Sequence, residues 1–234
     1  MVVLPKDFDE KHIKNESMKT NALGGKVVYM SYNDKKNIVM QTPMLSAPFG
    51  LSTYTDEKTG ITKFSLDVSF KGMENDQKIH TFYDKMEALD NHILSLAEEN
   101  SKEWLGKKMS REVVEALYRP IIKQAKDPEK YSPTMKFKIT NTSKGDINVE
   151  AYDNERNRVD MKDIIQGSKV RCIIECSSIW FVNKQFGVSW KLLQTEITKP
   201  DKITGFSFIE DSDDDDDDDD DEYEESDNED EVNL

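Results

Sequence analysis

Strict alternation of apolar and polar residues is the feature that most restricts how this chain can fold. In residues 61–70 the apolar residues Phe64, Leu66, Val68 and Phe70 alternate with the polar residues Lys63, Ser65, Asp67 and Ser69. A period of two predicts a strand with one buried face. Comparable β-rich runs cover residues 26–32, 37–41, 135–139, 147–152, 170–182 and 186–197. We therefore expect a mainly β fold with about seven strands.

One segment interrupts the β pattern with a helical period. From Asp76 to about Ser101, apolar residues recur at steps of three and four, which predicts a long amphipathic helix. A shorter helix is expected to begin at Ser110 as its N-cap and to end before Pro120. The sequence thus predicts a helical insert at about 75–120 inside a β domain that spans residues 25–209.

Charge divides the chain into a body and a tail. The 234 residues carry a net charge of −15, but 18 acidic residues and no basic one lie between Glu210 and Glu231. The rest of the chain holds 32 basic and 29 acidic residues, a net charge of +3. Because the tail has almost no apolar residues, we expect residues 210–234 to be a disordered acidic tail. Residues 1–24 are also polar, and we expect them to form a flexible N-terminal arm.

Several classes of protein are disfavoured by what the sequence lacks. It has neither an apolar run of 18 residues nor a signal-peptide pattern, so we expect an intracellular protein that is not secreted and does not enter a membrane. Cys172 and Cys176 would lie about 13 Å apart on one strand, which favours buried thiols over a shared zinc ion. Phosphate-binding loops and hydrolase motifs are missing too. We expect no cofactor, no metal site and no enzymatic activity.

Cations on the outer faces of the predicted strands suggest a surface for a phosphate backbone. If the strands are neighbours, these side chains form one basic face, although lysine and arginine are also what any strand shows to water. The candidates are Lys63, Lys136, Lys138, Arg171 and Lys191, with Lys184 in the late hairpin.

Aromatic rings near these cations could stack on the bases of a single strand. Phe49, Tyr54 and Phe181 are the better candidates, since they lie in loops or off the core parity. The other candidates are Tyr29, Tyr32, Phe186, Trp180 and Trp190. Trp180 shares the core parity, which favours a place in the core or at the barrel rim over a stacking role.

Two motifs and the layout of the chain resemble a known family. The motifs are residues 178–191 (SIWFVNKQFGVSWK) and residues 41–51 (QTPMLSAPFGL), and the layout is a β body with a central helix and an acidic tail. Together they resemble the single-stranded DNA-binding proteins of short-tailed phages and of nucleocytoplasmic large DNA viruses. The resemblance implies an OB-fold, a five-stranded Greek-key barrel. It also implies a homodimer and a tail that recruits replication proteins. The phage proteins end in an aromatic residue, whereas this chain ends in Leu234.

The expected function is therefore a non-catalytic protein that coats single-stranded DNA in viral replication, recombination or repair. The acidic tail would compete with DNA for the basic face at a high effective concentration. It would also recruit a polymerase, helicase or primase, with Asp213, Asp217, Asp221 and Leu234 as its contact residues. The expected location is the host nucleus or a cytoplasmic site of viral replication. Two alternatives stay open, namely a histone-chaperone-like or scaffolding protein that acts through the tail, and a viral structural protein.

Overall fold

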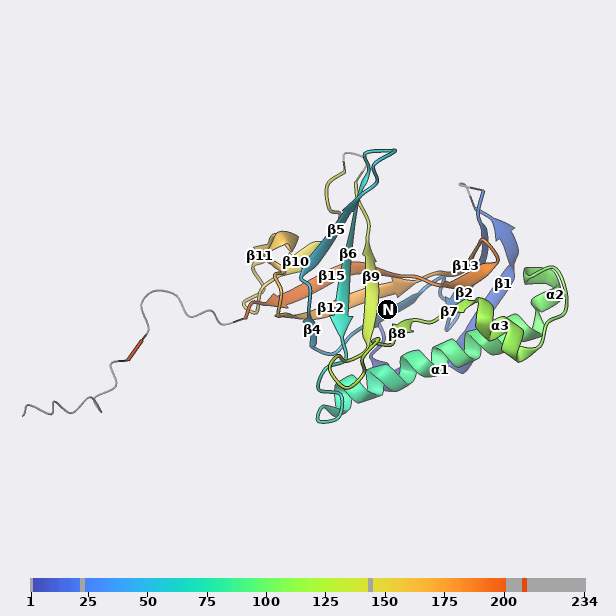
Figure 1. Ribbon diagram of the computed structural model, residues 1–234, viewed down its shortest axis with the longest axis horizontal. Helices are drawn as coiled ribbons and strands as arrows, with labels where there is room; N and C mark the ends of the chain where they lie inside the picture. The colour runs from blue at the N-terminus through green and yellow to red at the C-terminus, as the bar shows by residue number, and fades with distance from the viewer. Residues whose placement is uncertain (1, 22–23, 143–144, 201–207, 210–234) are drawn as a thin grey trace, which may run out of the picture. The chain divides into compact units, whose positions relative to one another are not determined.

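The computed structural model describes residues 2–21, 24–142, 145–200 and 208–209. The predicted acidic tail, residues 210–234 with Asp213, Asp217, Asp221 and Leu234, lies outside the described residues. The strands are β1 (Ile13–Thr20), β2 (Lys26–Tyr32), β3 (Ile38–Gln41), β4 (Leu45–Ala47), β5 (Leu51–Thr55), β6 (Thr62–Ser69), β7 (Tyr118–Arg119), β8 (Ile122–Lys123), β9 (Thr134–Ile139), β10 (Glu150–Tyr152), β11 (Arg158–Val159), β12 (Ser168–Cys176), β13 (Ser178–Val182), β14 (Gln185–Val188) and β15 (Trp190–Thr198) (Figure 1). The helices are α1 (Gln77–Glu99), α2 (Ser101–Trp104) and α3 (Arg111–Leu117), with short 3₁₀ turns η1 (Pro5–Asp7), η2 (Glu10–His12) and η3 (Met161–Asp163).

Five strands close into a barrel in the order β4, β6, β9, β15, β12 and back to β4. The β9–β15 contact is parallel and the other four are antiparallel. Numbered along the chain, this order is 1-2-3-5-4, which is the five-stranded Greek-key barrel of the OB-fold. The predicted class, mainly β with a helical insert and an OB-fold-like barrel, is confirmed.

A second sheet is connected directly to the strands of the barrel. Its strand order is β1-β2-β13-β14-β7. One residue, Ser177, separates β12 in the barrel from β13 in this sheet, and one residue, Ser189, separates β14 from β15. The chain therefore passes twice between the two sheets with almost no loop.

Helix α1 packs its apolar stripe on the core as the periodicity predicts. The Asp76 carboxylate accepts hydrogen bonds from the backbone N–H of Lys78 (2.8 Å) and Ile79 (3.3 Å), which fixes the start of the helix. Phe82 is fully buried, and its ring lies 5.6 Å from that of Phe70 at the end of the barrel strand β6. In the described part of the chain, no helix has the long apolar stretch that a membrane span needs.

The N-terminal segment differs from the flexible arm that the sequence predicts for residues 1–24. Strand β1 pairs with β2 along most of its length, and Val3 exchanges backbone hydrogen bonds with the β3 residues Val39 and Gln41. Phe8 is buried, with its ring 5.2 Å from that of Tyr32. The segment is polar on average, but apolar side chains such as Phe8 and Ile13 reach the core, and this anchors it to the domain.

Candidate nucleic-acid interface

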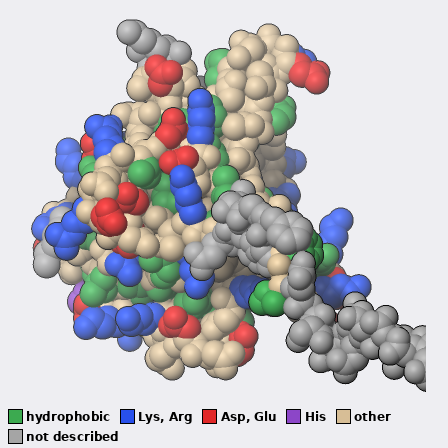
Figure 2. All heavy atoms as spheres, turned by 90° about the vertical axis from the view of Figure 1, so that its left-hand side faces the viewer, with side chains coloured by type: hydrophobic (Ala, Val, Ile, Leu, Met, Phe, Trp, Pro, Cys, Tyr) green, Lys and Arg blue, Asp and Glu red, His purple; other side chains and the backbone are tan. Residues whose placement is uncertain are grey.

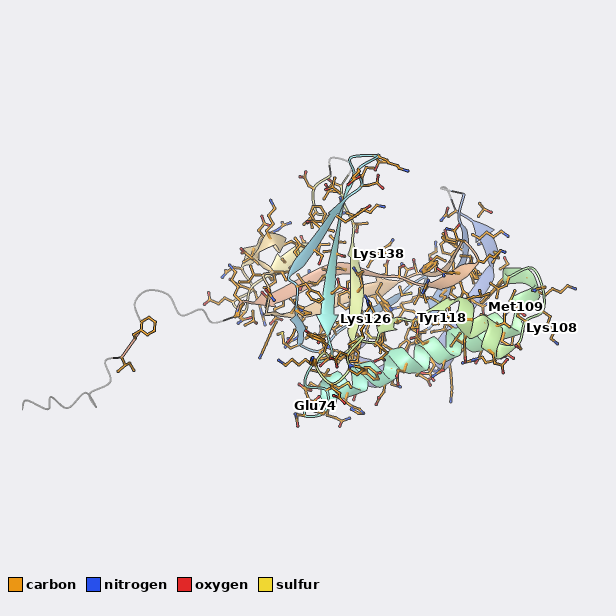
Figure 3. The ribbon with its side chains drawn as sticks, viewed as in Figure 1. Glu74, Lys108, Met109, Tyr118, Lys126 and Lys138 are labelled. Atoms are coloured by element: carbon orange, nitrogen blue, oxygen red, sulfur yellow. The ribbon has the colours of Figure 1, made fainter. Side chains whose placement is uncertain are left out.

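A groove of about 650 Å³ separates the wall of the barrel from the second sheet. Side chains from β2, β9, β13 and β15 line it, among them Tyr29, Trp180, Lys138 and Lys191. We call it the Trp180 groove. The β5–β6 and β1–β2 hairpins rise on the same side of the barrel (Figure 1), and Lys138 lies in the region between them (Figure 3). The groove is therefore open between two projecting hairpins.

The strand register brings three lysines together at the barrel wall. Lys138 on β9 is the partner of Lys191 on β15, and on its other side it is the partner of Ser65 on β6. Lys63 lies two residues before Ser65 and so projects from the same face. Partial desolvation of Lys138, together with the charges of Lys191 and Lys63, lowers the pKa of its ammonium group.

These three ammonium groups are available to a ligand. Among the described residues, none of the three takes part in an ion pair. Like charges held close together raise the electrostatic energy of the free protein. An oxyanion such as a phosphate would lower that energy, so the cluster is suited to receive negative charge.

Two aromatic side chains face this cluster from the second sheet. Trp180 on β13 is partly exposed, and Tyr29 on β2 is 38% exposed. A Cβ atom added at Gly187 on β14 would lie 3.0 Å from Trp180 Cζ2 and 2.9 Å from the Arg119 carbonyl oxygen. Only glycine leaves room there for both the indole ring and the neighbouring strand β7, so Gly187 helps to hold the ring in place.

The structure reverses the sequence-based assignment of Trp180 and Phe181. Trp180 lines the groove, whereas Phe181 points to the other face of the sheet. Its ring centroid lies 5.8 Å from that of Trp104 and 5.7 Å from that of Phe186. The cause is the break at Ser177. Cys176 before the break and Ile179 after it are both buried, so the inward positions change from even to odd numbers.

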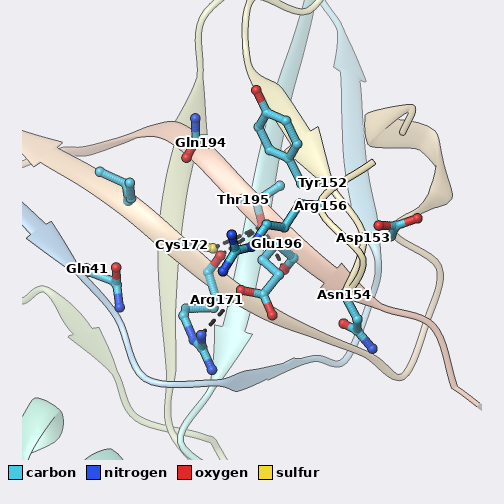
Figure 4. Close-up of a pocket in the computed structure, with 11 residues that line it drawn as sticks. Gln41, Tyr152, Asp153, Asn154, Arg156, Arg171, Cys172, Gln194, Thr195 and Glu196 are labelled. Carbon is cyan, nitrogen blue, oxygen red and sulfur yellow. Dashed lines mark hydrogen bonds and ion pairs between the residues drawn. The ribbon is translucent and has the colours of Figure 1, made fainter. Parts of the chain in front are cut away.

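Arg171 does not belong to the groove, contrary to the prediction. It lines a separate polar pocket of about 470 Å³ with Tyr152, Arg156 and Glu196 (Figure 4). Its guanidinium Nη1 lies 3.3 Å from Glu196 Oε2, the residue opposite it on β15. Acidic and basic side chains are mixed on this side of the molecule (Figure 2). Arg171 shares the outer face of the barrel with the lysine cluster, but it lies nearer the start of β12 than Glu175, the residue opposite Lys191, and it has its own counter-ion.

The other predicted site residues have mixed surroundings. Tyr54 is exposed and lies opposite Lys63 on the β5–β6 hairpin, so it extends the cluster. Lys136 Nζ lies 3.2 Å from Asp67 Oδ2, so the carboxylate offsets the charge of the lysine. Lys184 is exposed in the turn of the β13–β14 hairpin, and Phe49 is exposed in the turn after β4. Neither of these two lines the Trp180 groove.

Tyr29 is an aromatic groove residue that the sequence offers as a stacking candidate but that the predicted site residues do not include. It lies opposite Ser178 on β13, and its ring centroid is 5.8 Å from Lys19 Nζ. The signal was in the sequence, because Tyr29 lies between the apolar residues Val28 and Met30 in a predicted strand and must project away from the core there.

The described residues offer little for covalent or metal chemistry. Both Cys172 and Cys176 are buried, and burial raises the pKa of each thiol to about 12, so neither is a reactive thiolate near neutral pH. No group of three His, Cys, Asp or Glu side chains in this part of the chain is arranged to hold a metal ion.

The barrel order and the basic, aromatic groove at its wall define a protein of the OB-fold class. Residues 66–208, more than half of the chain, match a family of unknown function (DUF5871), and the chain belongs to that family. It is similar to the single-stranded DNA-binding protein of bacteriophage Enc34 in complex with ssDNA, with 15% identity, a TM-score of 0.46, and coverage of 81% of this chain and 98% of that one. It is also similar to the single-stranded DNA-binding protein gp2.5 of bacteriophage T7, with 15% identity, a TM-score of 0.44, and coverage of 74% and 98%. No curated protein matches the sequence significantly.

Proposed function

We propose that this chain is a non-catalytic protein that binds single-stranded DNA in the Trp180 groove. The observation that carries the proposal is that unpaired lysines and partly exposed aromatic rings line the two walls of one groove on an OB-fold barrel. Lys138, Lys191 and Lys63 would contact phosphates, and Trp180 and Tyr29 would stack on bases. Stacking accepts every base, because each has a π-face, so binding would tolerate any sequence.

The test is fluorescence anisotropy of a labelled oligo-dT titrated with the full chain over a range of salt concentrations. On a single strand, each neutralised phosphate contributes about 0.7 to the slope of log affinity against log salt. Replacing Lys63, Lys138 and Lys191 together by glutamine should therefore lower the slope by about 2. Trp180→Ala should weaken binding by about 5-fold to about 150-fold, which corresponds to about 1–3 kcal/mol per stacked base, with little change in slope.

A matched triple variant controls for total charge. Lys71, Lys78 and Lys126 are exposed and line neither the Trp180 groove nor the Arg171 pocket, so replacing them by glutamine removes the same charge elsewhere. This control should keep the slope within experimental error. Equal slopes for the two triple variants would remove the lysine cluster from the phosphate path, and an absence of oligo-dT binding at low salt would refute the function.

We further propose that the acidic segment 210–231 competes with DNA for the groove and recruits replication proteins. This rests on its 18 acidic residues and on the basic cluster. Replacing the run Asp213–Asp221 by asparagine in the full chain should tighten oligo-dT binding. If it leaves DNA binding unchanged and abolishes binding to histones, the histone-chaperone-like or scaffolding function is the better one. Roles in viral replication, recombination or repair, a homodimer, and a nuclear or cytoplasmic viral site stay predictions.

A further inference from the structure

A second groove, of about 660 Å³, lies on the other face of the β13–β14 hairpin. It is formed by the hairpin, by helices α2 and α3, and by the loop between these helices. We call it the Val113 groove. It shares only the hairpin residues Val182, Asn183 and Gln185 with the Trp180 groove. The hairpin is thus a common wall between two separate grooves.

The lining of the Val113 groove is apolar and partly open to solvent. Trp104 is buried beneath it and packs edge-on against Phe181, whose ring also stacks on that of Phe186. Aliphatic side chains supply the accessible surface, with Val113 44% exposed. Met109 and Leu117 are partly buried beside them. Such a surface favours a bulky apolar side chain over a stacked base.

The rim of the same groove is basic. Lys26, Lys107 and Lys184 come from three different segments and are all exposed. None of them forms an ion pair with another described residue. Glu103 is the one carboxylate of the lining, and its Oε1 accepts a long hydrogen bond from the Met18 backbone N–H (3.4 Å). The rim therefore has a net positive charge.

We propose that the Val113 groove docks an acidic segment of a partner protein that carries a bulky apolar side chain between its carboxylates. The apolar side chain would fill the space beside Val113, and the carboxylates would pair with the rim lysines. Charge complementarity selects the acidic partner, and the aliphatic lining distinguishes this site from the Trp180 groove. The proposal does not depend on DNA binding, since Trp180 and Phe181 project from opposite faces of β13.

The test uses a labelled synthetic peptide of aspartate and glutamate with one phenylalanine and one leucine, titrated with the full chain by fluorescence anisotropy. A matched peptide has both apolar residues replaced by serine. The titrations are repeated with the full chain in which Asp213–Asp221 are replaced by asparagine, so that the chain's own acidic run cannot mask binding. We expect the apolar-containing peptide to bind at least one of these two chains at least about tenfold more tightly than the serine peptide does, as burial of one bulky side chain allows.

Two variants locate the site, and a third controls for charge. Val113→Asp, and Lys107→Glu combined with Lys184→Glu, should each weaken peptide binding at least about tenfold. Lys71→Glu combined with Lys78→Glu changes the net charge as much as the double groove variant does, at two exposed positions outside the groove, and should not weaken binding. Thermal unfolding of each variant verifies that it is folded, which we expect because the substituted positions are exposed. The proposal is overturned if the peptide binds neither chain, if the serine peptide binds equally well, or if the groove variants bind like the wild type. It is also overturned if these variants reduce oligo-dT binding but leave peptide binding intact.

Discussion

Asp90 on α1 makes the stability of the domain depend on pH in a direction unusual for a carboxylate. Its carboxylate accepts hydrogen bonds from the Tyr118 hydroxyl (2.5 Å) and from the Ile121 backbone N–H (3.1 Å), which tie α1 to the segment after α3. Burial outweighs these hydrogen bonds and raises the pKa of Asp90 from 3.8 to about 6. The folded state therefore holds this proton more tightly than the unfolded chain does.

The size of the effect follows from that difference. A shift of about two pKa units corresponds to about 3 kcal/mol. Below about pH 4 the carboxyl is protonated in both states and contributes nothing. As the pH rises through the interval up to about 6, only the unfolded state releases the proton, so the free energy of unfolding falls. Above about pH 6 the destabilisation is complete.

Asp90→Asn tests this reasoning, because asparagine cannot ionise. The assay is urea unfolding of the wild type and the variant from about pH 4 to about pH 7.5. The variant should gain stability relative to the wild type by up to about 3 kcal/mol as the pH rises. Any hydrogen bond that the amide cannot make is an offset that does not vary with pH. Glu74→Gln, at an exposed carboxylate before α1 (Figure 3), should show no such gain. A difference between Asp90→Asn and wild type that is constant across this range would refute the reasoning.

Three further predictions concern the groove and the core. Gly187→Ala would place a methyl group 2.9 Å from the Arg119 carbonyl oxygen and 3.0 Å from Trp180, so it should reduce oligo-dT affinity several-fold and lower the melting temperature. Unchanged affinity would argue against a role for the Trp180 ring. Because the pKa of Lys138 is lowered in the free protein, a bound phosphate should raise it, and DNA binding at alkaline pH should take up protons. Calorimetry in two buffers with different ionisation enthalpies measures this uptake, and Lys138→Gln should abolish it. Phe82→Ala should cost about 3–5 kcal/mol in chemical denaturation, because the ring is fully buried, and a loss below about 1 kcal/mol would contradict its place in the core.

The sequence is informative wherever one strand keeps a single inward face. The parity of β6, β9 and β15 correctly placed Lys63, Lys138 and Lys191 on the outside of the barrel, and the helical period located α1 with Asp76 at its start. Local periodicity determines these features, so no knowledge of the tertiary fold is needed to find them.

Features set by long-range pairing could not be found in this way. Whether Arg171 is free depends on Glu196, which becomes its neighbour only when β12 and β15 pair. Trp180 and Phe181 project from the faces opposite to those predicted because the single residue Ser177 interrupts the strand, and no periodicity in the sequence marks this break. Polar composition suggested a flexible N-terminal arm, because an average over the segment conceals the burial of Phe8.

The one-residue junctions at Ser177 and Ser189 have a mechanical consequence. They connect the barrel wall that carries Lys191 to the sheet that carries Trp180 through two nearly continuous strands. Widening the groove would therefore require both strands to bend, whereas two domains joined by a hinge can separate without such bending. The backbone would then set the width of the groove and so the thickness of the ligand that it admits. Side-chain substitutions would change the affinity for the ligand but not this width.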